Sequence, residues 1–379
     1  MKVGIVGNYG HDNNGDEAIL QGILTQLLVD LNIDRENITI FSNNPENTKA
    51  RYGLKAVKLL HKRGSLLKSV AATINKNNRI IKELDVLIIG GGGLLMDMYK
   101  RDAPLYFSHA LMGRFGGCKV VIYGVGAGPI TTKSGSFLIK RMIGAAHSIS
   151  VRDSESKELL EKIGVEKPIQ IIADPAFKLG ERLKKEMSLS VKKIGVTAVP
   201  YFSKEYWPES NEEKYEAFVF GMANNLDEII KEHDAEITFF STKYPQDVKV
   251  TEDIVNVMKE KGAVTILKDN LNPDQLVSIC GKQDIIIGTR LHSLILSVAA
   301  ETPIVGVGYH RKVRNFMRRI SKEKYYIDIE QMNKPGILNE LIHEYKRNWQ
   351  MEQKSFSTIS SQQVMEAKKG LEQIGQVLR

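Results

Sequence analysis

Short apolar segments that alternate with helical patterns are the feature of this sequence that most constrains its fold. Such segments lack a polar face, which is typical of parallel strands covered by helices on both sides. Because parallel strands need a crossover between them, the alternation predicts βαβ units and an α/β fold. We expect strands at 2–6, 37–41, 86–89, 119–123, 148–151, 169–172, 194–199, 236–240, 264–267, 285–287 and 304–307.

A chain of 379 residues is too long for one ordinary domain and suits two of moderate size. A charged stretch at 178–193 interrupts the alternation, which then resumes. We therefore predict two doubly wound, Rossmann-like domains and C-terminal helices, one of them amphipathic over 360–379. In such tandem folds ligands bind in a cleft at the carboxyl ends of the strands. The expected boundaries are 1–180 for the N-terminal domain, 181–193 for the linker, 194–335 for the C-terminal domain and 336–379 for the helices.

The excess of Lys and Arg over Asp and Glu gives a net charge of +8, which favours anionic partners. No helix-turn-helix, RNP or zinc-finger pattern accompanies the charge, so nucleic acid is not expected. No apolar run reaches the roughly 18 residues that span a membrane. Met1 leads straight into a strand, without a signal peptide. We expect a cytoplasmic protein, compatible with peripheral contact at the inner face of the membrane.

The segment "GNYGHDNNGDEAIL" at 7–20 joins the first strand to a helix. Its spacing is not the dinucleotide fingerprint, which disfavours nicotinamide and flavin cofactors. Gly15 lets the chain turn sharply beside Asp16 and Glu17. A helix N-terminus favours carboxylates, so capping alone could explain both. Within the whole pattern we favour catalysis for Asp16 and capping for Glu17.

Glycines also follow two later strands, in "GGGG" at 90–93 and "GVGAGP" at 124–129. Glycine at a strand end allows something to come close to the backbone. Either a ligand at Gly91, Gly92 and Gly126 or close packing against the other domain would explain this. The two cysteines, Cys118 and Cys280, are far apart and form no metal-binding pattern, so we expect buried free thiols and no metal.

Cationic side chains stand at other strand ends. Arg152 follows the strand at 148–151, and Lys312 follows the strand at 304–307. Arg290 and His292 stand where the segment "GTRLHSLIL" changes from strand to helix, and we expect them in the first helical turn. A cation is unfavourable there unless an anion lies beside it. The sequence therefore predicts an anion site.

Together, "NNGDEAIL", "GGGLLMD", "VRDSES", "DPAF" and "GTRLHSLILSVAAETPIVGVGYHRKV" resemble the polysaccharide pyruvyltransferase family, in order, from the first strand to about Val313. The family commonly has Asp-Pro before the last lysine, where His310 and Arg311 stand here. The resemblance implies a fold like that of type B glycosyltransferases. It also implies transfer of a carboxyethylidene group from phosphoenolpyruvate to two hydroxyls of a sugar in a bacterial cell-wall or exopolysaccharide precursor, with no cofactor.

The resemblance also implies roles for individual residues. Arg290, His292, Lys312 and Arg152 would bind phosphoenolpyruvate, with the C-terminal domain as the donor side. His292 and Asp16 would be the catalytic acid and base, in either assignment, and the N-terminal domain would take a glycan that can be lipid-linked. Two alternatives remain: a nucleotide-sugar-dependent type B glycosyltransferase, and a non-catalytic glycan-binding assembly protein.

Overall fold

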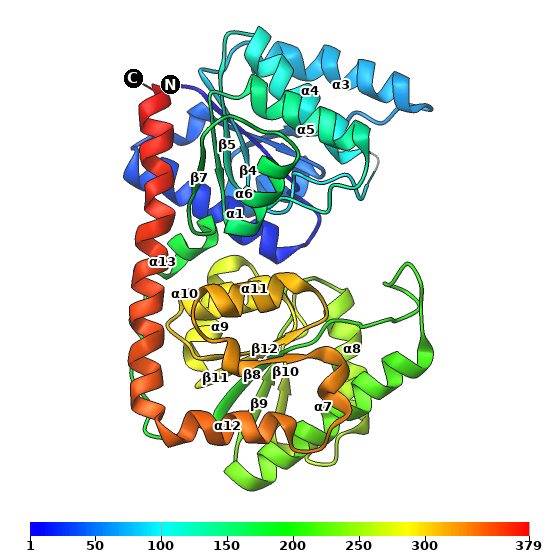
Figure 1. The fold of residues 1–379 in the computed structure, drawn as a ribbon, viewed down its shortest axis with the longest axis vertical. Coiled ribbons are helices and arrows are strands. Elements are labelled where there is room, and N and C mark those ends of the chain that lie inside the picture. Colours follow the sequence, from blue (N-terminus) through cyan, green and yellow to red (C-terminus); the bar gives the residue numbers. More distant parts are fainter. Residues whose placement is uncertain (100, 379) are drawn as a thin grey trace. The chain divides into compact units, whose positions relative to one another are not determined.

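The computed structural model describes residues 1–99 and 101–378 (Figure 1). The chain forms two compact units. Unit 1 contains Met1–Lys178 and Gln363–Arg379, and unit 2 contains Leu179–Gln362. Each unit is built on a parallel sheet with helices between its strands, which confirms the predicted fold class.

Unit 1 has a seven-stranded sheet in the order β3-β2-β1-β4-β5-β6-β7. The strands are β1 Val3–Val6, β2 Ile38–Ser42, β3 Lys55–Lys58, β4 Val86–Gly90, β5 Lys119–Val125, β6 Ser148–Val151 and β7 Ile169–Ile171. The helices are α1 Asn14–Thr25, α2 Pro45–Tyr52, α3 Leu66–Ile81, α4 Asp102–Phe115, α5 Lys133–Ala145 and α6 Ser154–Lys162.

The central strands of unit 1 are buried on both faces because helices cover each side. Leu87 and Ile122 lie in a core with residues of α4 and α5, which pack side by side (Figure 1). Side chains alternate between the faces of a strand, so Tyr123 points the opposite way from Ile122. There Tyr123 donates a hydrogen bond to Gln26 Oε1 at 2.7 Å.

Unit 2 has a six-stranded parallel sheet in the order β10-β9-β8-β11-β12-β13. The strands are β8 Lys193–Thr197, β9 Glu236–Phe239, β10 Val264–Ile266, β11 Ile285–Gly288, β12 Ile304–Gly308 and β13 Tyr326–Asp328. The helices are α7 Glu212–His233, α8 Gln246–Val257, α9 Pro273–Lys282, α10 Leu291–Ala299, α11 Arg311–Arg319, α12 Ile337–Arg347 and α13 Trp349–Leu378.

Every expected strand is present, and the sheets contain two more, β3 and β13. Both lie at a sheet edge. An edge strand need not be apolar on both faces, and β3 has an exposed lysine at each end. The apolar pattern by which the other strands were predicted is therefore absent from β3.

The amphipathic helix predicted at the C-terminus begins earlier than expected, at Trp349, and contains residues of both units. Arg379 lies outside the described residues. Its first part belongs to unit 2, where Trp349 Nε1 donates to the Ser188 carbonyl at 3.0 Å. Its last part belongs to unit 1, where the Ala367 carbonyl accepts from Gln26 Nε2 at 3.1 Å. The segment expected as a linker, 181–193, lies within unit 2.

Both cysteines are buried and form no disulfide, as predicted. Among the helices of the described residues, none is long and apolar enough to cross a membrane.

The packing of α1 yields a test of the fold. A methyl group at Gly22 would lie 2.1 Å from the Pro175 carbonyl oxygen. We expect Gly22→Ala to lower the free energy of unfolding by about 1–3 kcal/mol, because backbone must move. The matched control is Gly144→Ala in α5, where a methyl group meets nothing within 4 Å. That change should stabilise the protein by roughly 0.5–1 kcal/mol through helix propensity. Urea unfolding of both variants measures the effects, and equal stability would contradict the packing.

Candidate functional site

The structure brings four of the predicted residues of unit 1 together at the carboxyl end of its sheet. Gly91 and Gly92 follow β4 with φ of +75° and +69°, a conformation that favours glycine. A side chain at Gly92 would meet Asp16 Oδ1 at 2.9 Å. The Gly92 carbonyl accepts from the Gly126 backbone N–H at 2.8 Å, which links the ends of β4 and β5.

Asp16 lies in the first turn of α1, directly after the buried Gly15, and is only 8% exposed. Its Oδ2 accepts hydrogen bonds from Asn8 Nδ2 at 3.0 Å and from Asn13 Nδ2 at 2.8 Å. Two amides of the β1–α1 loop thus hold one carboxylate oxygen, and the other lies toward Gly92. This geometry suits a carboxylate that accepts a proton from a bound hydroxyl.

Arg152 follows β6 and is 5% exposed. Its Nη1 donates to Asp174 Oδ2 at 2.8 Å, and Asp174 is fully buried. Burial opposes the charge of Arg152, but Asp174 and then Asp153 outweigh that effect, so the pKa of the guanidinium is raised. A methyl group at Gly126 would lie 3.1 Å from Arg152 Nε, so a larger residue would crowd the guanidinium.

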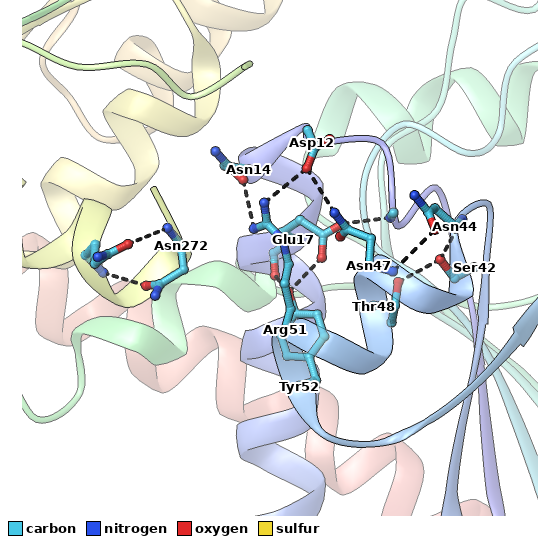
Figure 2. A network of polar contacts seen from close by, with 12 residues as sticks. Asp12, Asn14, Glu17, Ser42, Asn44, Asn47, Thr48, Arg51, Tyr52 and Asn272 are labelled. Atoms are coloured by element: carbon cyan, nitrogen blue, oxygen red, sulfur yellow. Dashed lines mark hydrogen bonds and ion pairs between the residues drawn. The ribbon is translucent and has the colours of Figure 1, made fainter. Parts of the chain in front are cut away.

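Glu17 has a structural role, although it does not bind its own helix N-terminus. Its carboxylate accepts from the Gly10 N–H at 2.7 Å and from the Tyr52 hydroxyl at 2.7 Å (Figure 2). Burial raises the pKa of this carboxyl group. Arg51 binds the same loop through Asp12 at 3.2 Å and Asn14 at 3.0 Å (Figure 2). The β1–α1 loop is therefore fixed to α2.

In unit 2, Arg290 is the N-cap residue of α10, one position before the helix in which it was expected. Its guanidinium binds Asp247 through two hydrogen bonds, Nη2 to Oδ1 at 2.5 Å and Nε to Oδ2 at 3.3 Å. Asp247, at the start of α8, is fully buried. Burial by itself would lower the pKa of the Arg290 guanidinium. The negative charge of Asp247 outweighs this effect and raises the pKa, so Arg290 stays cationic.

Tyr206 lies between two cations. Its hydroxyl oxygen accepts from Arg290 Nη1 and from Lys243 Nζ, each at 3.1 Å. Burial alone would raise the pKa of the phenol, but Arg290 and Lys243 together lower it below its ordinary value. This site can hold negative charge or move a proton.

The other two predicted residues of unit 2 lie at helix N-termini. His292 is in the first turn of α10 and is half-buried. Lys312 is the second residue of α11. His310 caps that helix, because its Nδ1 accepts from the Lys312 backbone N–H at 3.3 Å. The histidine thus supplies the capping acceptor at the position where the family commonly has aspartate.

Sequence reasoning missed Asp247, Tyr206 and Lys243. Each follows a predicted strand of unit 2, since Tyr206 lies beyond β8 and the other two lie beyond β9. A polar residue after a parallel strand reaches the same sheet edge as Arg290. Their position after strands could have predicted that these residues lie at this edge. The pairing of Asp247 with Arg290 could not be predicted, because 43 residues separate them in the chain.

Among the described residues, one cluster has ligand atoms close enough for a metal ion: Glu232, His233 and His343. Its groups already bind each other and their surroundings. His343 Nε2 lies 2.5 Å from Glu232 Oε1, and Lys346 Nζ lies 3.0 Å from His233 Nδ1. An ammonium at that nitrogen opposes a second cation. We interpret the cluster as a hydrogen-bonded link between α7 and α12.

Comparison with known proteins identifies the family. Residues 13–311 match the family model described as polysaccharide pyruvyl transferase, so the chain belongs to this family. A curated relative is the amylovoran biosynthesis protein AmsJ of Erwinia amylovora. It is 25% identical over 383 residues, which cover 89% of this chain and 90% of the relative.

Two solved structures illustrate the shared fold. HepE of Anabaena, solved in complex with UDP and glucose, has a TM-score of 0.63 at 10% identity and covers 100% of this chain and 99% of its own. A glycosyltransferase of Rickettsia africae has a TM-score of 0.61 at 15% identity, with coverage of 100% and 99%. At these identities the likeness concerns the fold, which is that of type B glycosyltransferases.

The environment of Tyr206 yields a spectroscopic test. Because its folded pKa is lowered from 10, we expect a phenolate absorbance component that appears below that pH and is absent from Tyr206→Phe. Lys243→Met should move the component to higher pH. Tyr201→Phe is the control, since burial raises the pKa of Tyr201 to about 12. Difference spectra recorded against pH would contradict the assignment if Tyr206→Phe titrated like the unchanged protein.

Proposed function

We propose that the protein transfers a carboxyethylidene group from phosphoenolpyruvate to two hydroxyls of a sugar and releases phosphate. The observation that carries the proposal is the oriented Arg290, with Lys243 and His292 on the same sheet edge, in a chain of the pyruvyl transferase family. The acceptor is a glycan in a bacterial exopolysaccharide or cell-wall pathway. AmsJ, a protein of amylovoran biosynthesis, supports the exopolysaccharide assignment.

In this proposal unit 2 binds the donor. Phosphoenolpyruvate carries a phosphate and a carboxylate, and the planar guanidinium of arginine suits either group. Two nitrogens of Arg290, Nε and Nη2, donate to Asp247. The guanidinium is therefore oriented before phosphoenolpyruvate binds. Arg290 and Lys312 are the proposed ligands of the two anionic groups within unit 2, and the proposed contribution of Arg152 is a cation at the matching sheet edge of unit 1.

The reaction needs one acid and one base. A proton is added to the enol methylene, a sugar hydroxyl attacks the resulting cationic carbon and loses its proton, and the C–O bond to phosphate breaks as phosphate leaves. The second hydroxyl then attacks the same carbon, loses its proton and closes the ketal. In either assignment, one of His292 and Asp16 donates the first proton and the other accepts the proton of the first hydroxyl, while the proton of the second hydroxyl leaves on the released phosphate. Tyr206 is a third candidate, because its lowered pKa brings its proton closer to the working range.

Unit 1 takes the acceptor in this proposal. Asp16 is held by two amides beside Gly92, where the glycine backbone leaves room for a sugar hydroxyl. Packing within unit 1 already requires Gly91, because a side chain there would meet Ile19 Cγ2 at 2.0 Å. The proposed role of Gly92 and Gly126 is close approach of the acceptor to the backbone.

A nucleotide-sugar glycosyltransferase is the second candidate, because HepE, which was solved with UDP and glucose, has the same fold. Such enzymes often have a glutamate that holds ribose at the helix where this chain has Arg290 and His292. The two functions differ in their donor, which makes the donor the first measurement.

We expect calorimetry to detect phosphoenolpyruvate and not UDP-glucose, because the cations of unit 2 match a small dianion or trianion. Phosphate release should then require a glycan acceptor and persist after chelation, since arginine can neutralise the leaving group. Binding of UDP-glucose without phosphoenolpyruvate would support the glycosyltransferase instead. Binding of a glycan alone would support an assembly protein.

Two substitutions separate donor binding from proton transfer. Arg290→Lys should raise the KM for phosphoenolpyruvate strongly, because an ammonium cannot replace the guanidinium held by Asp247. His292→Ala should lower kcat by roughly 10²–10⁴-fold with little change in donor affinity. Steady-state kinetics, with circular dichroism as a folding control, measure both. A normal kcat in folded His292→Ala would exclude proton transfer by this histidine.

A further inference from the structure

Two cations of unit 2 converge on one hydroxyl oxygen. Arg290 Nη1 and Lys243 Nζ each lie 3.1 Å from the hydroxyl oxygen of Tyr206, which accepts from both. The ring of Tyr206 also contacts both cations, since its centre lies 5.1 Å from Arg290 Cζ and 4.7 Å from Lys243 Nζ. Two charged donors that share one acceptor suit an anionic oxygen. A tyrosine hydroxyl therefore occupies a position at which the surrounding charges favour an anion.

One buried carboxylate holds both cations in place. Both oxygens of Asp247 accept from the guanidinium of Arg290, and Oδ2 also accepts from the Lys243 backbone N–H at 3.0 Å. The negative charge of Asp247 balances that of Arg290, whereas no carboxylate of the described residues forms an ion pair with Lys243. The site thus keeps one uncompensated positive charge. It is also organised before a ligand binds, which lowers the entropy cost of binding.

Tyr206 belongs to the segment 198–211, which joins β8 to α7 without a helix or strand of its own. The segment closes on itself, because the Asn211 N–H donates to the Phe202 carbonyl at 3.0 Å. Compact loops whose ends are joined in this way are frequently functional. Phe202 has a φ of +59°, a conformation that is uncommon for residues other than glycine. Such conformations cluster at ligand clamps and in switch segments.

The other contacts of this segment are aromatic or exposed. The Trp207 ring lies 5.4 Å from that of Tyr309, which follows β12, and 5.5 Å from that of Tyr201, measured between ring centres. Glu205 forms an ion pair with Lys249, and both side chains are more than half exposed. An exposed ion pair contributes little stability. Moving the segment away from the two cations therefore breaks no regular secondary structure.

We propose that Arg290 and Lys243 together bind the phosphate group of phosphoenolpyruvate, and that Tyr206 occupies this site until the donor displaces it. The inference rests on the proposed function, because it concerns the donor of that reaction. Phosphate matches the site better than carboxylate does, because it carries more charge and its oxygens can accept from both cations at once. The carboxylate is then left to Lys312. Donor binding is thereby coupled to movement of the segment 198–211.

The competition between Tyr206 and the donor is tested by calorimetry of the full chain with phosphoenolpyruvate and with inorganic phosphate. Tyr206→Phe removes the oxygen that both cations bind. We expect this variant to bind each ligand roughly tenfold more tightly, because apparent affinity rises with the fraction of molecules whose site is open. Tyr201→Phe makes the same change in the same segment, where the hydroxyl binds Glu330 at 3.3 Å, and should leave affinity unchanged. Equal or weaker binding by Tyr206→Phe overturns the competition.

The role of Lys243 is tested in the same titrations. Lys243→Met should weaken phosphate binding about tenfold, because it removes one of the two charged donors. Lys192→Met is the matched control, since this exposed lysine precedes β8 and lies at the opposite edge of the sheet. Equal affinity of Lys243→Met and Lys192→Met for phosphate excludes Lys243 from the site.

Displacement of the segment is read from the fluorescence of Trp207, whose ring lies 6.0 Å from that of Tyr206. The chain has two tryptophans, so Trp349→Phe leaves Trp207 as the only indole. We expect saturating inorganic phosphate to change the Trp207 emission. Unchanged emission with phosphate bound overturns the displacement. A lower kcat in Tyr206→Phe with unchanged donor affinity would assign Tyr206 to proton transfer instead.

The proposed function and the competition fail in different ways. If phosphoenolpyruvate binds neither the unchanged protein nor Tyr206→Phe, whereas inorganic phosphate binds the variant more tightly, the donor assignment is rejected and the anion site stands. If phosphoenolpyruvate binds both proteins equally, the competition is rejected and the proposed function stands.

Discussion

The requirement that parallel strands be covered on both faces determines most of this structure. Parallel strands cannot be joined by tight turns, so each connection carries a helix across a face of the sheet. Every such connection carries the chain back to the edge at which the strands begin. All strands therefore end at the opposite edge. As a result the segments after β1, β2, β3 and β4 all meet at the carboxyl end of unit 1. The same rule gathers the segments after β8, β9, β11 and β12 in unit 2.

Each unit places one buried arginine–aspartate pair at this edge. Arg152 binds Asp174 in unit 1, and Arg290 binds Asp247 in unit 2. Removing two such charges from water costs several kcal/mol, and an apolar pair of similar volume is often no less stable. Stability alone therefore gives little reason for these pairs. An oriented cation that can meet an anion gives a functional reason for both.

Unit 1 contains two different electrostatic environments at the carboxyl end of its sheet. Near Asp16, Arg152 is neutralised by Asp174, and the Asp16 carboxylate accepts hydrogen bonds from two neutral amides. A basic pocket is lined by Lys58, Lys62, Arg63 and Lys76, which lack a carboxylate partner among the described residues. The carboxylate of Asp16, held by neutral donors, suits the proposed proton transfer. The basic pocket suits an anion that supplies the missing charge.

The sequence by itself determined the α/β class and eleven of the strands, because burial on both faces leaves a continuous apolar pattern. It also predicted that Asp16, Gly92, Gly126 and Arg152 lie at one edge of a sheet, since residues that follow parallel strands reach that edge whatever the helices between them. Only the tertiary structure decided the rest. Asp247 and Arg290 are 43 residues apart, and no local pattern encodes that pairing. The edge strand β3 lacks the apolar pattern because solvent replaces one neighbouring strand. The lysines at and after β3 form a cationic pocket only because the fold brings them beside Arg101.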